Sequence, residues 1–133
     1  MKANEVVFNG LRVLAVEDDA DSLNLLAFVL EQYGIEVAKA ASANQALEIF
    51  AQVEPQLLIF DIAMPELDGY MLLRQIRTLE AANSKPTPAI ALTAMVGDDR
   101  RAEAMAAGFQ VYLTKPFDLD ELITAIAKLC VRN

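Results

Sequence analysis

Acidic residues follow two apolar segments of this 133-residue chain. Residues 11 to 16 (LRVLAV) lead into the acids at 17 to 19 (EDD), and residues 57 to 60 (LLIF) lead into Asp61. If folding brings these carboxylates together, they will resist ionisation unless a cation neutralises them. The chain has no histidine and one cysteine, so the ligands on offer are hard oxygens, which suit Mg²⁺ better than Zn²⁺.

Two other polar residues end later apolar segments. Thr93 ends the segment 86 to 93 (PTPAIALT), and Lys115 follows the segment 109 to 114 (FQVYLT). A bound magnesium ion favours phosphate, whose oxygens Lys115 can hold as a point charge and Thr93 as a hydrogen-bond donor. Asp61 is then the natural nucleophile for an aspartyl phosphate. Taken alone, Thr93 is better explained as a β-branched strand residue than as a phosphate contact.

The composition narrows the functions open to the chain. A formal net charge of -8 argues against direct binding to nucleic acid or to an anionic membrane. The lack of histidine excludes histidine-dependent triads and general bases. No apolar stretch reaches the roughly 20 residues of a membrane span. With a single cysteine, Cys130, and no signal-peptide pattern at the start, we expect a cytoplasmic protein without membrane insertion.

Hydrophobic spacing predicts five strands, each followed by a helix. The expected strands span residues 11–16, 35–40, 57–60, 86–93 and 109–114, and the expected helices span 22–34, 42–54, 68–80, 98–108 and 118–130. Strands joined through helices pair in parallel, and continuous apolar strands fit a sheet covered on both faces. We therefore expect an α/β domain with a doubly wound, five-stranded parallel sheet. Ligands of such sheets gather at the carboxyl ends of the strands.

The motifs, taken together, resemble those of a known family. VLAVEDD, LLIFDIAMPELDGY, IALTA and VYLTKPF are similar, in order and in spacing, to the response-regulator receiver domain of two-component signalling. The resemblance covers nearly the whole chain. It implies a flavodoxin-like fold with strand order 2-1-3-4-5 and helices on both faces, with a lead-in over residues 1–10 and the receiver domain over residues 11–131.

The resemblance also implies a role for each polar residue at the strand ends. Asp61 would accept a phosphoryl group, which Thr93 and Lys115 would contact, and Thr93 would act with Tyr112 as the switch. The implied magnesium ligands are Glu17, Asp18, Asp61 and the backbone carbonyl of Ala63. Of the acidic pair, Asp18 would bind the metal directly and Glu17 through water.

The acidic run at 17 to 21 has a second interpretation. These acids can cap the following helix and complement its dipole, an effect worth about 0.3 to 1 kcal/mol. Taken alone, the run supports capping and metal binding equally, and the presence of Asp61 and Lys115 favours the metal site. The metal pair is matched to Glu17 and Asp18, which leaves Asp19 as an outer residue.

Without a histidine, the chain cannot be its own histidine phosphodonor. We expect phosphate to come from a histidine kinase, a histidine phosphotransfer protein or a small molecule such as acetyl phosphate. The output would be a downstream protein target at the face of the last two helices and the strand between them. The expected state is a monomer or weak dimer. Enzymatic activity beyond its own phosphorylation and dephosphorylation is not expected.

Rival functions have weaker support. A phospho-aspartate phosphatase would typically have a second acid two residues after its nucleophile, where Ala63 stands, and a nucleotide-binding domain would have a glycine-rich loop in place of EDDAD. A phosphate-independent interaction scaffold of the same fold stays open. So does the choice between a freestanding regulator and a receiver of a hybrid sensor kinase.

The first helix offers a docking hypothesis. Its predicted core stripe comprises Ser22, Leu25, Leu26, Val29 and Tyr33. That stripe leaves Leu23, Ala27 and part of Phe28 toward the margins, where an apolar surface suits a partner helix. In the resembling family the kinase binds at this helix, and crowding by neighbouring elements is an equal alternative.

Overall fold

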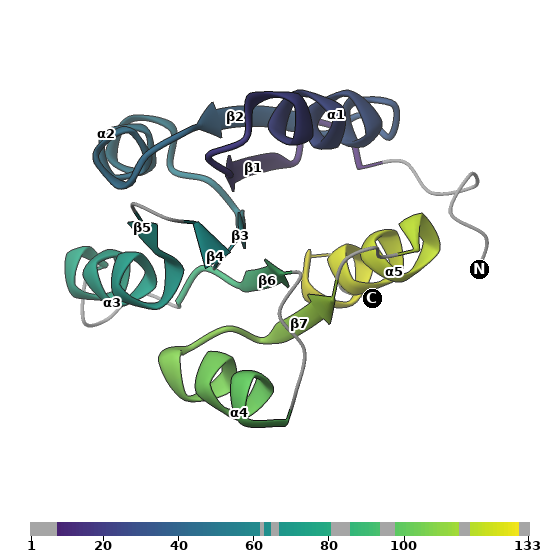
Figure 1. Cartoon of the computed structure of the whole chain (residues 1–133). Coiled ribbons are helices and arrows are strands. Elements are labelled where there is room, and N and C mark those ends of the chain that lie inside the picture. The colour runs from purple at the N-terminus through teal and green to yellow at the C-terminus, as the bar shows by residue number, and fades with distance from the viewer. Residues whose placement is uncertain are drawn as a thin grey trace.

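Five strands form one parallel sheet in this computed structural model, which describes residues 8–61, 63–64, 67–80, 86–93, 98–114 and 118–130. The strands are β1 (Arg12–Val16), β2 (Glu36–Ala40), β3 (Leu57–Asp61), β6 (Ala89–Thr93) and β7 (Val111–Thr114). The helices are α1 (Ala20–Glu31), α2 (Ala43–Val53), α3 (Gly69–Leu79), α4 (Asp98–Ala107) and α5 (Leu119–Cys130). The spatial order β2-β1-β3-β6-β7 confirms the predicted order 2-1-3-4-5 (Figure 1).

Helices cover both faces of the sheet, as predicted. α1 and α5 lie over one face, and α2, α3 and α4 lie over the other (Figure 1). Successive strand residues point to opposite faces. Leu58 and Phe60 of β3 therefore enter the core under α2, α3 and α4, while Leu57 and Ile59 enter the core under α1 and α5. This is why the strands read as continuous apolar runs.

Local signals in the sequence set several element boundaries. The Ser42 hydroxyl accepts a hydrogen bond from the Gln45 N–H at 3.2 Å and caps the N-terminus of α2. Gly34 and Gly108 follow α1 and α4 with φ of 82° and 113°, backbone angles that favour glycine. Between β3 and α3 the chain forms a two-stranded antiparallel hairpin of β4 (Ala63–Met64) and β5 (Leu67–Asp68).

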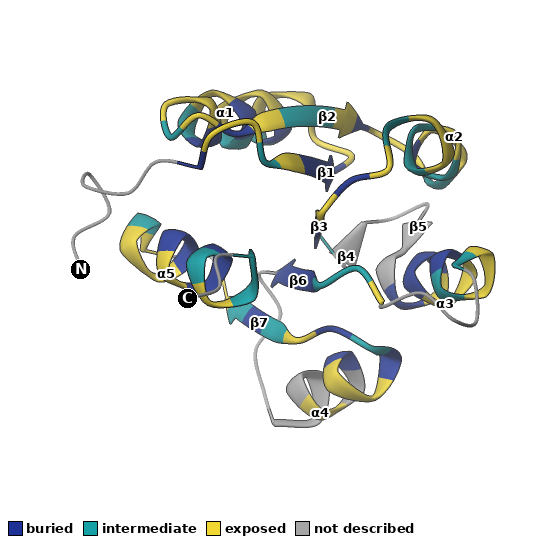
Figure 2. Ribbon diagram, turned by 180° about the vertical axis from the view of Figure 1, so that it is seen from behind, coloured by how far each residue is buried: buried dark blue, intermediate teal, exposed yellow. Residues whose placement is uncertain are grey.

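The predicted core stripe of α1 is right in part: Leu26 and Tyr33 pack against the core under α1 and α5, but Leu25 does not. Leu25 and Phe28 are 64% and 61% exposed, whereas Leu23, Ala27 and Leu30 are buried. Figure 2 shows the buried side of α1 toward the sheet and the exposed side outward. The helix is apolar nearly all round, so its hydrophobic residues alone do not set its phase. Its polar residues do, because Asp21, Asn24 and Glu31 share the solvent side with Phe28.

The lead-in contributes to the core at its last residues. Phe8 is 4% exposed and packs in the core under α1 and α5. Its backbone N–H donates to the Tyr33 carbonyl at 2.6 Å, and the Gly10 N–H donates to the Gly34 carbonyl at 3.0 Å. Phe8 thus belongs to the folded unit, while the domain limits at residues 11 and 131 stay predictions. Among the described helices, none has the length and apolar character needed to cross a bilayer.

Candidate functional site

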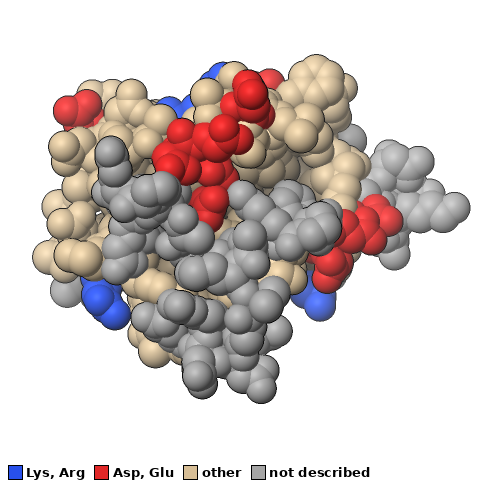
Figure 3. Space-filling model, in the orientation of Figure 1, with Lys and Arg blue, Asp and Glu red and all other residues tan. Residues whose placement is uncertain are grey.

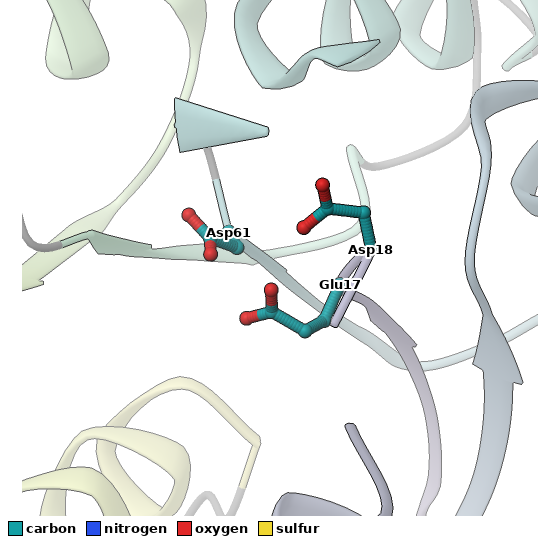
Figure 4. Close-up of side chains that lie close together, drawn as sticks. All are labelled: Glu17, Asp18 and Asp61. Atoms are coloured by element: carbon teal, nitrogen blue, oxygen red, sulfur yellow. The ribbon is translucent and has the colours of Figure 1, made fainter. Parts of the chain in front are cut away.

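The carboxyl ends of β1 and β3 bring the predicted acids together. Val16 of β1 lies beside Phe60 of β3 in the parallel register, so the residues that follow them, Glu17 and Asp61, emerge at the same edge. Carboxylate oxygens of Glu17, Asp18 and Asp61 all lie within 4.8 Å of one another. Figure 4 shows the three carboxylates pointing into one space.

The three acids differ in exposure. Glu17 is buried at 6% exposure, Asp61 is half-buried and Asp18 is exposed. The backbone N–H of Glu17 donates to the Ala40 carbonyl at the end of β2 at 3.1 Å, which fixes the residue at the rim of the sheet. Acidic side chains gather in the upper part of the face drawn in Figure 3. The site therefore combines one desolvated carboxylate with two that solvent or a phosphodonor can reach.

Asp19 has a different role from its two neighbours. Its carboxylate accepts from the Ser22 backbone N–H at 3.0 Å and from the Ser22 hydroxyl, which makes Asp19 the N-cap of α1. Its own N–H donates to Oε1 of Glu17 at 3.3 Å. The acidic run is thus divided: Asp19 caps the helix, and Glu17 and Asp18 are grouped with Asp61.

The remaining predicted site residues are described only in part. Thr93 is the last residue of β6 and follows Leu92, the partner of Asp61 in the register, so its backbone lies at the same edge. Tyr112 of β7 is buried at 6% exposure in the core that includes Ala104 of α4.

Three further predictions concern the surroundings of Asp61. Ala63 lies in β4 opposite Asp68. The Thr93 side chain and all of Lys115 lie outside the described residues, so their predicted contacts with a phosphoryl group stay predictions. On α1, sequence reasoning placed Leu25 in the core and Leu23 at the margin, the reverse of what the structure has, and the polar stripe of that helix would have indicated the exposed side.

The donor set fits a magnesium ion. Three carboxylates this close repel one another, and a divalent cation held between them would compensate that repulsion. All three offer carboxylate oxygens, the ligand type that Mg²⁺ prefers, and they come from two adjacent strand ends held by backbone pairing. The cluster therefore could bind a divalent metal at the sheet edge where open α/β folds place their ligands.

Fold and site together define a class: a doubly wound α/β domain with an acidic group at the carboxyl ends of its central strands. The response regulator receiver domain family matches residues 13–127. The chain belongs to this family, whose members are receiver domains of two-component systems and are generally phosphoacceptors rather than enzymes.

Three similar proteins illustrate the relationship. An uncharacterized 14.6 kDa protein in the sodA1 3′ region of Leptolyngbya boryana is 42% identical over 119 residues, covering 90% of this chain and 89% of that protein. The receiver domain of the Francisella response regulator 1452 has a TM-score of 0.80 at 31% identity, with 90% and 96% of the two chains covered. The receiver domain of Saccharomyces cerevisiae Ssk1, solved with the histidine phosphotransfer protein Ypd1, has a TM-score of 0.83 at 28% identity, with 93% and 91% covered.

Other curated relatives are longer proteins. The chain spans 23% of the regulatory protein AtoC from Escherichia coli and 46% of the transcriptional regulatory protein TrcR from Mycobacterium tuberculosis. In these relatives the matching part is accordingly one portion of a larger protein.

Proposed function

We propose that the chain is a phosphoryl-accepting signalling switch in which a partner histidine kinase or histidine phosphotransfer protein phosphorylates Asp61 in a Mg²⁺-dependent reaction. The observation that carries the proposal is the grouping of Glu17, Asp18 and Asp61 within 4.8 Å. Asp61 is half-buried at a strand end, so its backbone is held by the sheet while its carboxylate is still reachable by a donor. Membership of the receiver family supports the same role.

In the proposed reaction, a carboxylate oxygen of Asp61 attacks the phosphorus of a phosphohistidine. The new O–P bond forms as the N–P bond of the donor breaks, and the electron pair stays on the imidazole nitrogen, which then takes a proton from water. A bound Mg²⁺, held by Glu17, Asp18, Asp61 and the Ala63 carbonyl, would neutralise charge on the transferred group. Oε1 of Glu17 accepts a hydrogen bond from the Asp19 N–H at 3.3 Å, which helps to orient this carboxylate beside Asp18 and Asp61 (Figure 4). Thr93 and Lys115 would contact the phosphoryl oxygens.

Phosphorylation would change the surface near β7, the strand at one edge of the sheet. The phosphoryl group carries about -1.5 to -2 charges at neutral pH and replaces the single charge of the Asp61 carboxylate, which would draw Lys115 and the Thr93 hydroxyl toward it. Tyr112 would respond to this movement, and its burial in the core that contains Ala104 of α4 supports the proposal. The output would be the surface of α4, β7 and α5, presented to a downstream protein target.

Intact-mass measurement with acetyl phosphate and Mg²⁺ tests the proposal. We expect an adduct of about 80 Da, the mass of one phosphoryl group, that depends on Mg²⁺. Asp61→Asn should remove the adduct, and the matched control Asp21→Asn, at an exposed position of α1, should keep it. A wild-type chain without the adduct would favour the phosphate-independent scaffold. An adduct that survives in Asp61→Asn would exclude this site.

We further propose that the histidine-containing partner docks on the outer side of α1. Leu25 and Phe28 expose 64% and 61% of their surface there, on the helix whose N-terminus adjoins the carboxylates. Exposed apolar side chains of this kind suit contact with a partner helix. The complex of the similar Ssk1 receiver with Ypd1 supports a partner of this class.

Leu25→Ala tests the docking surface, with Leu79→Ala on α3 as the matched control, because Leu79 is 60% exposed on another helix. We expect Leu25→Ala to slow phosphotransfer from a histidine phosphotransfer protein and to leave phosphorylation by acetyl phosphate unchanged. Equal effects of the two variants on the protein donor would contradict this surface.

A further inference from the structure

Arg77 of α3 connects three segments at the edge of the sheet opposite Asp61. Its Nη1 donates to the Thr87 carbonyl at 2.7 Å and to Oε1 of Glu80 at 3.0 Å. Its Nη2 donates to the Gly108 carbonyl at 3.1 Å, just past the end of α4. One guanidinium therefore holds the end of α3, the approach to β6 and the end of α4.

Glu80 completes this clamp. Its Oε2 accepts from the Thr87 N–H at 2.7 Å and from the Thr87 hydroxyl at 2.8 Å, while Oε1 accepts from Arg77. The side chains of Arg77 and Glu80 are 21% and 9% exposed, so water screens the ion pair only partly. Burial acts to raise the pKa of Glu80, but the Thr87 and Arg77 contacts outweigh it and lower that pKa below its ordinary value.

The end of α4 is held by packing as well as by charge. Gly108 has a φ of 113°, and a Cβ there would lie 3.4 Å from Leu73 Cδ2 and 3.6 Å from Arg77 Nε. The next residue, Phe109, packs its ring edge-on against Phe60 and Tyr70, with centroids 5.9 and 6.3 Å apart. The turn from α4 into β7 is thus fixed against α3 and against the strand that carries Asp61.

We propose that this clamp makes the C-terminal end of α4 a fixed pivot, so that phosphorylation of Asp61 moves the N-terminal end of α4 and leaves residues 105–109 in place. The inference rests on the proposed function of Asp61. Hydrogen bonds to charged groups are stronger than neutral ones, so displacing residues 105–109 would have to break the costliest contacts of the helix end. A helix of ten residues is about 15 Å long, so a small rotation about one end moves the other appreciably.

The first measurement uses the unphosphorylated protein. Amide hydrogen exchange of residues 105–109 should be about tenfold faster in Arg77→Gln than in wild type, since local opening no longer breaks the clamp. Arg77→Lys keeps the charge without the forked geometry, so its exchange rate should rise less than that of Arg77→Gln. This variant replaces Arg77→Gln if the latter folds poorly. Arg74→Gln, at an exposed position one turn earlier on α3, is the matched control and should leave this exchange unchanged.

The second measurement adds beryllofluoride and Mg²⁺ as a phosphoryl mimic. Wild-type amide shifts should change at residues 98–102 and stay unchanged at 105–109, and in the Arg77 variants the changes should extend to 105–109. Equal shift changes at both ends of α4 in wild type would overturn the pivot and leave the proposed function of Asp61 standing. Unaltered hydrogen exchange in both Arg77→Gln and Arg77→Lys would do the same. A wild-type protein in which no amide responds to beryllofluoride would overturn the proposed function and the pivot together.

Discussion

Charged side chains are arranged differently at the two ends of the parallel strands. At the carboxyl ends of β1 and β3, three like charges lie within 4.8 Å of one another. At the other edge, Arg77 and Glu80 form an ion pair at 3.0 Å whose remaining hydrogen-bonding groups are shared with Thr87 and Gly108. The first arrangement costs stability until a cation arrives, and the second provides stability without one. The first arrangement suits a site that could bind a cation, and the second joins α3 to α4 and to the segment before β6.

A second arginine repeats the stabilising pattern. Arg12, at the start of β1, donates through Nε to the Val53 carbonyl at 3.2 Å and through Nη2 to the Glu54 carbonyl at 3.1 Å. It thereby satisfies carbonyls at the C-terminal end of α2, where Glu54 adopts a left-handed backbone with φ of 51°. A cation at a helix C-terminus also complements the helix dipole. Both arginines thus hold helix ends at the edge away from Asp61.

Arg77→Gln should have the largest effect on stability. The substitution leaves the Glu80 carboxylate and two carbonyls without their charged donor, which we expect to lower the free energy of unfolding by about 1 to 3 kcal/mol. Urea unfolding at neutral pH measures this change. Arg12→Gln is the comparison, and its loss should be smaller because Arg12 is exposed. Equal losses would show that burial does not set the strength of these contacts.

Asp61→Asn should change stability in the opposite direction. Without divalent metal, removing one of three like charges should raise the free energy of unfolding by up to about 1 kcal/mol, the interaction of two charges about 4 Å apart in water. Added Mg²⁺ should stabilise the wild type more than this variant, because metal binding to the folded state adds about 1.4 kcal/mol at about tenfold its Kd. Thermal unfolding with EDTA and with Mg²⁺ separates the two effects. A destabilised metal-free variant would contradict the comparison.

Much of the fold followed from local pattern. Continuous apolar segments and intervening amphipathic helices indicated a doubly wound parallel sheet, and the resemblance supplied the strand order that the structure has. The grouping of Glu17, Asp18 and Asp61 was accessible because residues that end parallel strands converge at one edge. Helices and strands can be recognised from the spacing of apolar residues, and the ends of the strands from the polar residues that follow them; a sequence shows both directly.

The features that escaped prediction depend on tertiary partners. The Arg77 clamp joins residues 10 and 31 positions away along the chain, and no local spacing marks such a contact. The phase of α1 is a different case, because Leu25 is as apolar as the buried Leu23 and only the polar residues Asp21, Asn24 and Glu31 mark the solvent side. The side chains that would test the Thr93 and Lys115 predictions lie outside the described residues.

The N-caps of α1 and α2 test the effect of charge near the carboxylates. Asp19 caps α1 beside the carboxylates, and Ser42 caps α2 without a charge. Ser42→Ala should lower the free energy of unfolding by about 1 kcal/mol, a typical cap loss. Asp19→Ala loses a similar cap but also removes a negative charge near Glu17, so its loss should be smaller in low salt without divalent metal. Raising the ionic strength should narrow the gap between the two variants, and a gap that salt does not change would count against the charge explanation.

The smallest effect concerns the pH dependence of the clamp. Glu80 has a pKa lowered from its ordinary value of 4.5, because the Thr87 and Arg77 contacts together outweigh the opposing effect of burial. Near pH 4.5 the unfolded chain binds more protons at this residue than the folded chain, so the stabilisation from Glu80 is complete above that pH and disappears as the pH falls through the lower folded value. Glu80→Gln lacks this titration. The stability difference between wild type and Glu80→Gln should therefore be constant from pH 7 to 6 and shrink below pH 4.5, as measured by urea unfolding across that range. A difference that stays constant down to pH 3 would show that the folded clamp does not favour the ionised carboxylate, and the contrast between the two edges of the sheet would then rest on geometry alone.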